Sequence, residues 1–251
     1  MIKLINNSSL ILNNVISQVG IVRHLSKFVG FEGKVYEYLQ PRSIIKPPYH
    51  HVCQIGDPVL RLAAEPIELE IIKTAEFKKF VDHLVKVMRT YDGFGMSAPQ
   101  IGVSSQIFVI ETTKKQYNEM ILEKTAGQPV EEVPLTVFIN PTVKVTDFAI
   151  TQYPECCASI CGLMANVPRA KGIQIKALDI NGDPFTWDAA GWPAKIAQHE
   201  FDHLQGKLYT DIMDRKSLSC TVWEAVNRRA GKISIDYYPV TRSKLRRFFF
   251  T

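Results

Sequence analysis

Acidic side chains are missing from the first 31 residues of the chain, and the first acidic residue is Glu32. Basic, serine and asparagine residues are scattered there among apolar ones. This composition is typical of a mitochondrial transit peptide, so we assign residues 1–40 to a disordered leader and predict a location in the mitochondrial matrix. Asn13 and Asn14 interrupt the continuous apolar core that a secretory signal requires, which disfavours that class. A disordered leader that does not target the protein to any compartment remains an alternative.

Long apolar runs are also missing. No stretch reaches the roughly 20 apolar residues of a membrane-spanning helix, so we expect no transmembrane segment. Cysteine is scarce, and five cysteines are an odd number without the density of a disulfide framework. A reducing compartment fits them better than an oxidising one. They are Cys53, Cys156, Cys157, Cys161 and Cys220.

The chain has 251 residues and 46% apolar residues, which is enough for one large domain or two small ones with a full core. Residues 1–31 contribute +3 and residues 228–251 contribute +6 to the net charge of +5, so residues 32–227 carry −4. The positive charge lies at the ends, which indicates targeting or a contact surface. We therefore predict a folded catalytic domain over residues 48–227 and a basic C-terminal tail over residues 228–251.

The middle of the chain alternates helix and strand signals. Apolar residues from Phe77 to about Arg89 recur at helical spacing. The glycine-rich stretch 93–102 lacks the lysine and hydroxyl of a phosphate-binding loop, so we interpret it as a turn that shapes a groove, with Gln100 as a side-chain donor. Residues 112–134 are polar without a clear period and are predicted to be a surface insertion. Strands are predicted at 106–110, 135–139, 143–145, 149–153, 172–179 and 185–189, with a hairpin turn at Asn181-Gly182.

The strongest chemical signal is the segment His199-Glu200-Phe201-Asp202-His203. Residues four apart share one face of a helix, so His199 and His203 can present two imidazoles to one metal ion. Glu200 would then lie close enough to act on a metal-bound water as a general base. A catalytic zinc-type site needs a third protein ligand.

The third ligand separates the alternatives. In a metallopeptidase with a His-Glu-x-x-His helix, a downstream acid such as Glu224 would complete the site. The simplest alternative is that both histidines belong to an ordinary buried helix. A helix before the predicted antiparallel strands and a metal-binding helix after them indicate an α+β domain.

Three blocks carry a family resemblance. They are the glycine-rich stretch 93–102, Glu155-Cys156-Cys157-Ala158-Ser159, and the helix segment that begins at His199. In these blocks, and in their order, the chain resembles the peptide deformylases of the mitochondrial type, over roughly residues 48–215. The resemblance implies an α+β fold in which antiparallel strands pack around a C-terminal metal-binding helix.

The resemblance also implies a mechanism. Cys157 would be the third ligand beside His199 and His203, for one divalent metal ion, with Fe²⁺ expected and Zn²⁺ an alternative. The reaction would be hydrolysis of the N-formyl group from the initiator formyl-methionine of newly made mitochondrial proteins. Metal-bound hydroxide would attack the formyl carbon while Glu200 serves as general base and acid. The Gln100 side chain and the Ala158 backbone N–H would stabilise the developing negative oxygen.

Further residues match family positions. Arg169 is expected to pair with Glu155 and hold the strand that carries the cysteine. Residues near the methionine pocket are predicted to be Gly95, Tyr153, Trp192 and Ile196.

One departure from the family lies inside the site. The residue before the ligand cysteine is glycine in the family and Cys156 here, which adds a side chain and a second thiol. This change, together with the basic and aromatic residues 242–250, leaves open a catalytically weakened, metal-stabilised protein that contacts the mitochondrial ribosome. Because neighbouring side chains leave opposite faces of a strand, we expect Cys157 alone to bind the metal.

Overall fold

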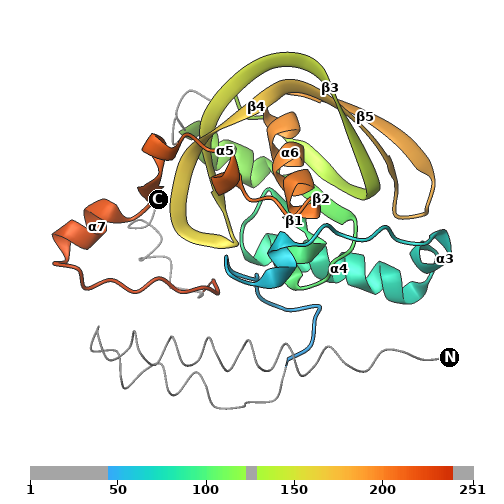
Figure 1. Ribbon diagram of the computed structural model, residues 1–251, viewed down its shortest axis with the longest axis horizontal. Helices are drawn as coiled ribbons and strands as arrows, with labels where there is room; N and C mark the ends of the chain where they lie inside the picture. Colours follow the sequence, from blue (N-terminus) through green and yellow to red (C-terminus); the bar gives the residue numbers. More distant parts are fainter. Residues whose placement is uncertain (1–44, 123–128, 240–251) are drawn as a thin grey trace. The chain divides into compact units, whose positions relative to one another are not determined.

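The computed structural model describes residues 45–122 and 129–239 (Figure 1). The chain divides into two units, residues 1–45 and 46–251, and every helix and strand described here lies in the second. The predicted leader, residues 1–40, and the basic and aromatic cluster 242–250 lie outside the described residues. Their assignments stay predictions.

In its described residues the second unit contains four short 3-10 helices, five α-helices and one sheet. In chain order the elements are η1 (Pro58–Arg61), α3 (Leu69–Ile72), α4 (Ala75–Thr90), β1 (Gly95–Ser97), η2 (Ala98–Ile101), β2 (Ile107–Thr112), α5 (Lys114–Leu122), β3 (Val133–Cys157), β4 (Ile160–Leu178), β5 (Pro184–Ala190), α6 (Trp192–Leu204), η3 (Tyr209–Asp211), η4 (Arg215–Ser217), β6 (Ser219–Cys220) and α7 (Trp223–Arg228).

The sheet is antiparallel throughout, with the strand order β1-β2-β3-β4-β5 and with β6 paired to β4. Strands β3 and β4 curve around α6, which lies against the sheet (Figure 1). The predicted α+β class, with antiparallel strands packed around a C-terminal helix, is confirmed. This arrangement places the end of β3 beside α6.

The boundaries predicted for the strands were wrong in two regions. The strand expected at 172–179 is only the end of β4, which begins at Ile160. The three short strands expected within residues 135–153 are parts of the single strand β3, which runs for 25 residues. The pairing of β3 with β4 shifts register on both sides of Asp147. Such irregularities break the apolar alternation along a strand without ending it, so the sequence pattern looked like separate strands.

Strand β2 is buried on both faces, as its continuous apolar run predicts. Ile107 and Val109 belong to the core that β2 forms with α4. Phe108 and Ile110 belong to the core that it forms with α6. The sheet therefore separates α4 from α6, and successive side chains of β2 alternate between the two cores.

Helix α4 confirms the helix predicted from Phe77 to about Arg89. Its first turn is capped by Thr74, whose hydroxyl accepts a hydrogen bond from the backbone N–H of Phe77. Six apolar side chains of α4 are buried in the core beneath β1 and β2. The helix is structural, as its period indicates.

The polar stretch 112–134, predicted to be a surface insertion without a clear period, contains the helix α5. Thr113 and Gln116 cap this helix reciprocally, since the Gln116 N–H donates to Thr113 Oγ1 at 3.2 Å and the Thr113 N–H donates to Gln116 Oε1 at 3.0 Å. Threonine followed by glutamine three residues later is a known start signal for a helix. That spacing was the signal in the sequence that could have revealed α5.

Helix α6 begins after Gly191 and ends at Leu204, shortly before Gly206. Gly206 has a φ of +67°, and a Cβ there would lie 2.7 Å from the Arg61 carbonyl oxygen. Only glycine accommodates both that backbone conformation and that approach.

The predicted turn at Asn181-Gly182 is also present, between β4 and β5. Within residues 45–122 and 129–239, no helix is both long enough and apolar enough to span a membrane.

Candidate active site

Helix α6 and the end of β3 bring together three side chains that could hold a metal ion. One ligand atom from each of Cys157, His199 and His203 lies within 4.8 Å of the other two. The two imidazoles lie one turn apart on α6, with ring centroids separated by 5.1 Å. Cys157 Sγ lies 3.3 Å from His203 Nε2. The cluster is enclosed, since Cys157 and His203 are buried.

Glu224, the alternative third ligand, lies elsewhere. Its carboxylate pairs with Arg228 at 2.6 Å on α7, where both side chains are exposed. It does not belong to the Cys157, His199 and His203 group that the described part of the chain forms. The arrangement therefore offers no support for a metallopeptidase site completed by Glu224.

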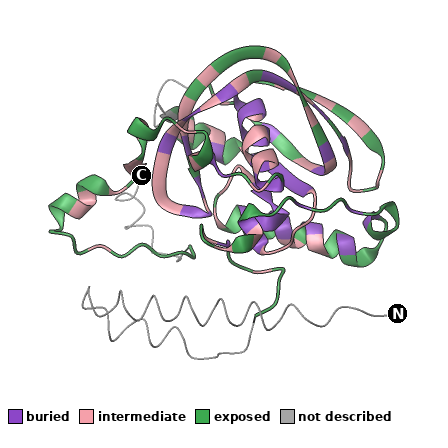
Figure 2. Ribbon diagram, viewed as in Figure 1, coloured by how far each residue is buried: buried purple, intermediate pink, exposed green. Residues whose placement is uncertain are grey.

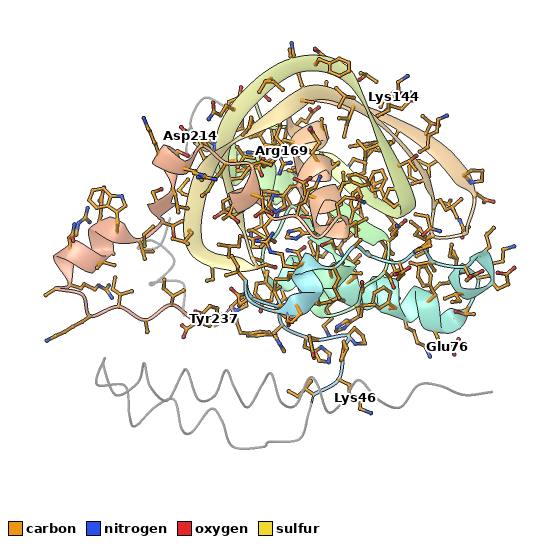
Figure 3. All side chains as sticks on the ribbon, viewed as in Figure 1. Lys46, Glu76, Lys144, Arg169, Asp214 and Tyr237 are labelled. Carbon is orange, nitrogen blue, oxygen red and sulfur yellow. The ribbon has the colours of Figure 1, made fainter. Side chains whose placement is uncertain are left out.

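A buried ion-pair network holds His199. Arg169 donates two hydrogen bonds to Glu155, from Nε and Nη2, each 2.9 Å long. Its Nη1 also pairs with Asp202 at 2.5 Å. Glu155 Oε2 lies 2.9 Å from His199 Nδ1, which leaves the other ring nitrogen of His199 for the cluster. The predicted pairing of Arg169 with Glu155 is confirmed, and Figure 3 shows Arg169 in the interior beside α6.

The charge of Glu155 suits this role. Burial raises the pKa of the Glu155 carboxyl, but the hydrogen bonds from His199 and Arg169 outweigh burial and lower the pKa to about 2. Glu155 is therefore an anion at neutral pH. A carboxylate on the far nitrogen of a ligand histidine fixes the tautomer and orientation of the ring.

The donor set fits a divalent transition metal. Burial raises the pKa of the Cys157 thiol, but His203 and His199 outweigh burial and hold that pKa well below its ordinary value. The thiolate is the form of cysteine that binds metals. One thiolate and two imidazoles suit zinc or ferrous iron, and three protein ligands leave a coordination position for a reacting molecule.

Glu200 lies on the buried face of α6, directly after His199, with only 3% of its surface exposed. Burial raises the pKa of its carboxyl to about 7. A group with this pKa can accept and release a proton near neutral pH.

Gly95 on β1 lies against Glu200. A Cβ built at Gly95 would lie 2.6 Å from both Cγ and Oε1 of Glu200. Any larger residue would therefore displace the carboxylate. Gly95 was predicted to line the methionine pocket, and the structure adds this contact with the predicted proton carrier.

The Gln100 side chain faces the cluster in a fixed orientation. Its Oε1 accepts hydrogen bonds from the backbone N–H of Ser97 at 2.8 Å and from Ser97 Oγ at 3.1 Å. Its amide nitrogen therefore turns toward Cys157 Sγ at 3.5 Å and Ser159 Oγ at 3.3 Å. Sequence reasoning overlooked Ser97, although serine followed by glutamine three residues later is the same capping signal as at α5.

The predicted pocket residues on α6 lie beside an unexpected cation. Trp192 and Ile196 are buried and Tyr153 on β3 is half-buried. Lys195 Nζ lies 5.4 Å from the Trp192 ring centroid and 5.9 Å from that of Tyr153, and it donates to the Pro154 carbonyl oxygen at 2.8 Å. Lysine in a sequence usually indicates an exposed position, so no pattern pointed to this residue.

Cys156 and Cys157 have opposite environments. Cys157 is 7% exposed, whereas Cys156 is an exposed residue. Successive residues of a strand alternate between its faces, which accounts for the difference. Cys156 is absent from the group of converging ligand atoms that the described residues form.

Tyr209 is a neighbour of the cluster that sequence reasoning missed. Its ring stacks near that of His199, with centroids 6.4 Å apart, and the side chain is almost fully buried. In the part of the chain that the structure describes, neither the Tyr209 hydroxyl nor His203 Nδ1 has a hydrogen-bond partner. Nothing in the sequence around Tyr209 indicated this position.

Comparison with known proteins agrees with the three sequence blocks. The family profile described as polypeptide deformylase matches residues 49–219. A human protein named mitochondrial peptide deformylase is 42% identical over 182 residues, which cover 72% of this chain and 75% of the human one. A tomato (Solanum lycopersicum) protein named chloroplastic peptide deformylase 1A is 38% identical over 162 residues, which cover 64% of this chain and 58% of the tomato one.

Solved structures show the same likeness in three dimensions. A ligand-bound class I type b peptide deformylase from Acinetobacter baumannii aligns with a TM-score of 0.57 and 25% identity, over 64% of this chain and 97% of that one. A plant peptide deformylase aligns with a TM-score of 0.56 and 31% identity, over 73% of this chain and 88% of that one.

Proposed function

The chain belongs to the peptide deformylase family, and we propose that Cys157, His199 and His203 are the ligands of its catalytic metal ion. Members of this family hydrolyse the N-formyl group of formyl-methionyl nascent peptides in a metal-dependent reaction, and this chain is an enzyme of that class. The observation that supports the residue assignment is the convergence of one thiol and two imidazoles within 4.8 Å.

A divalent ion held by these ligands would activate a water molecule for attack on the formyl carbon. Glu200 is the proton carrier in this proposal. It accepts the proton of the attacking water and gives it to the amine that leaves. Its pKa of about 7, raised by burial, supports both transfers at neutral pH.

Gln100 and the Ala158 backbone N–H are proposed to stabilise the formyl oxygen as it becomes negative. Fixed donors that point at the developing charge favour the transition state over the ground state. The hydrogen bonds from Ser97 support this role, because they turn the amide nitrogen of Gln100 toward the cluster before substrate arrives.

The peptide is proposed to bind along β1. This strand ends the sheet order, so one of its edges has no strand partner within residues 45–122 and 129–239. An extended peptide can add to such an edge through main-chain hydrogen bonds. The backbone at Gly95 would lie beside the peptide, and Tyr153, Trp192 and Ile196 would contact the methionine side chain.

The proposed metal is Fe²⁺, as the resemblance to the family implies; one thiolate and two imidazoles suit ferrous iron as well as zinc. Anaerobic loading of metal-free protein with Fe²⁺ or Zn²⁺, followed by metal analysis and activity measurement, distinguishes the two. Higher turnover per bound ion with Zn²⁺ would contradict the assignment of iron.

Formate release from a formyl-methionyl tripeptide tests the site as a whole. The metal-loaded protein should hold one ion per chain and release formate. Cys157→Ser should lose most of the metal and the activity, whereas Cys156→Ser, one residue away and exposed, should keep both. A Cys157→Ser protein that retained its metal would show that the wrong cysteine has been assigned.

The proposed location is the mitochondrial matrix. The acid-free leader supports it, as does the similarity to a human protein that is named mitochondrial. Deletion of residues 1–40 should leave formate release unchanged and keep the protein in the cytosol. Import of the shortened protein into mitochondria would refute a leader in these residues.

A transient contact with the mitochondrial ribosome is proposed for the basic tail. The positive charge of residues 228–251 would favour ribosomal RNA at low salt. A chain ending at residue 239 lacks the cluster 242–250 and should sediment with mitochondrial ribosomes less than the full chain. Equal sedimentation of the two would refute the contact.

A further inference from the structure

A short segment before η1, residues 52–55, connects the two groups proposed to bind the formyl oxygen. The Cys53 N–H donates to the carbonyl oxygen of Gln100 at 2.8 Å, and the Ile55 N–H donates to the carbonyl oxygen of Ser159, also at 2.8 Å. The first bond reaches η2, which carries Gln100. The second reaches the turn between β3 and β4, which carries Ala158.

Between these two backbone bonds, the side chain of Gln54 forms hydrogen bonds with the turn that joins β3 and β4. Its Nε2 donates to the Ala158 carbonyl oxygen at 2.8 Å, and its Oε1 accepts from the Cys161 N–H at 3.3 Å. Nε2 also lies 3.2 Å from the carbonyl oxygen of Val52, within the segment itself. One half-buried carboxamide therefore holds both ends of the turn that follows the ligand Cys157.

Contacts other than those with Gln100 and the β3–β4 turn also hold residues 52–55 in place. Val52 and Cys53 are buried, and Cys53 packs in the same core as Cys157. The Tyr91 hydroxyl accepts a hydrogen bond from the Val52 N–H at 3.1 Å and donates one to the Tyr237 carbonyl oxygen at 2.9 Å. Figure 3 labels Tyr237 in the stretch that follows α7.

We propose that Gln54 is a positioning residue for deformylation, because its bridge from Ala158 O to Cys161 N sets the distance between the Ala158 N–H and the Gln100 amide. This inference rests on the proposed roles of Gln100 and Ala158. Donors act on a developing oxyanion at about 2.7–3.1 Å, so a small displacement of the turn weakens one of the two bonds. Gln54 does not contact the reacting atoms and acts through Ala158.

The test compares Gln54→Ala and Gln54→Glu with a matched control, Gln106→Ala. Gln106 is also half-buried and also donates from Nε2 to a backbone carbonyl, that of Ala64 at 3.1 Å, but it lies before β2 and outside the proposed site. Gln54→Glu retains the acceptor for Cys161 and loses the donor to Ala158. We expect each Gln54 variant to lower kcat per bound metal about tenfold, which is less than complete removal of an oxyanion donor causes.

The other readouts separate positioning from stability. KM and metal content of the Gln54 variants should stay within about twofold of wild type, since a lost transition-state bond lowers kcat and kcat/KM equally. Gln106→Ala should lose a similar amount of thermal stability while its kcat stays unchanged. If the Gln54 variants lose stability only, with wild-type kcat per bound metal, or if the whole effect is in KM, the inference is wrong.

A double-mutant cycle with Gln100→Ala tests the coupling directly. Without the second donor, the substrate oxygen can follow a displaced Ala158 N–H, so Gln54→Ala should cost clearly less in the Gln100→Ala background than in wild type. The same fold-loss in both backgrounds would overturn the inference. If Gln100→Ala itself keeps full kcat, the proposed oxyanion site fails; if Gln100→Ala loses activity and Gln54→Ala does not, only the role of Gln54 fails.

Discussion

Helices α6 and α7 both carry acidic residues paired with arginine, but in opposite surroundings. On α6, Asp202 pairs with Arg169, whose side chain is only 5% exposed. On α7, Glu224 pairs with Arg228, and the two side chains are 58% and 77% exposed. Figure 2 shows the same contrast along the two helices, with α6 largely buried and α7 largely exposed.

The contrast shows where charged groups can control geometry. Removing one partner of a buried pair leaves a charge without compensation and costs about 3–5 kcal/mol, whereas an exposed pair contributes about 0–1 kcal/mol. The Arg169 network thus holds Glu155 and, through it, His199 in place. The α7 pair holds nothing that the proposed reaction uses.

Replacement of the buried glutamate of α6 should have the largest effect on catalysis. Glu200→Gln removes the proposed proton carrier but keeps the metal ligands, so kcat should fall about 10²- to 10⁴-fold with the metal retained. Formate release and metal analysis check this. Glu224→Gln on α7 is the matched control and should leave both unchanged; loss of metal in Glu200→Gln would contradict the role.

Removal of the arginine from each pair should change the free energy of unfolding much more for the α6 pair than for the α7 pair. Arg169→Met leaves the carboxylates of Glu155 and Asp202 without their partner, and we expect a loss of about 3–5 kcal/mol in the free energy of unfolding. Arg228→Met should change it by less than about 1 kcal/mol. Urea denaturation of both variants measures the difference. Equal losses in the free energy of unfolding would show that burial does not make the Arg169 network contribute more to stability than the exposed pair.

A methyl group at Gly95 tests the close packing of β1 against α6. Its Cβ would meet Glu200 at 2.6 Å, so Gly95→Ala should push the carboxylate out of place and lower kcat about 10- to 100-fold. Metal content should not change, because the ligands lie elsewhere. A Gly95→Ala enzyme with wild-type kcat would mean that Glu200 can shift without consequence.

Cys156→Gly should have the smallest effect and sharpens the comparison. Cys156 is next to the proposed ligand Cys157 in sequence but is exposed, so it should behave like a residue of α7. We expect metal content within about twofold of wild type and a kcat that is unchanged or higher, since only an exposed side chain is removed and the proposed ligand Cys157 is kept. Metal loss in Cys156→Gly, with retention in Cys157→Ser, would reverse the assignment of the two thiols.

Local patterns in the sequence predicted much of this site. The two histidines of α6 were predictable because a helix places residues four apart on one face, whatever surrounds it. The same holds for α4, whose apolar period predicted it. The start of α5 and the orientation of Gln100 were predictable in principle, since both follow a Ser or Thr to Gln capping pattern over three residues.

Other features depend on residues far apart in the chain. Cys157 completes the cluster because β3 ends against α6, and spacing alone gave Glu224 an equal claim. Gln54, Lys195 and Tyr209 join the site through backbone or ring contacts that no residue type signals. The continuity of β3 through Asp147 was hidden because bulges disturb the alternation that identifies a strand.

The sequence by itself thus determined the helical pair of histidines that are the proposed ligands, the glutamate that follows the first of them, and the family to which the chain is similar. The family resemblance implied Cys157 as the third ligand, and the tertiary structure brings that side chain to the pair. Only the tertiary structure decided which carboxylate orients His199 and which side chain holds the turn after Cys157. The physical reason is the separation along the chain over which each kind of interaction acts. Helix periodicity and capping act over three or four residues, whereas Glu155, Arg169 and Gln54 bind partners that lie 14 to 107 residues away in the chain.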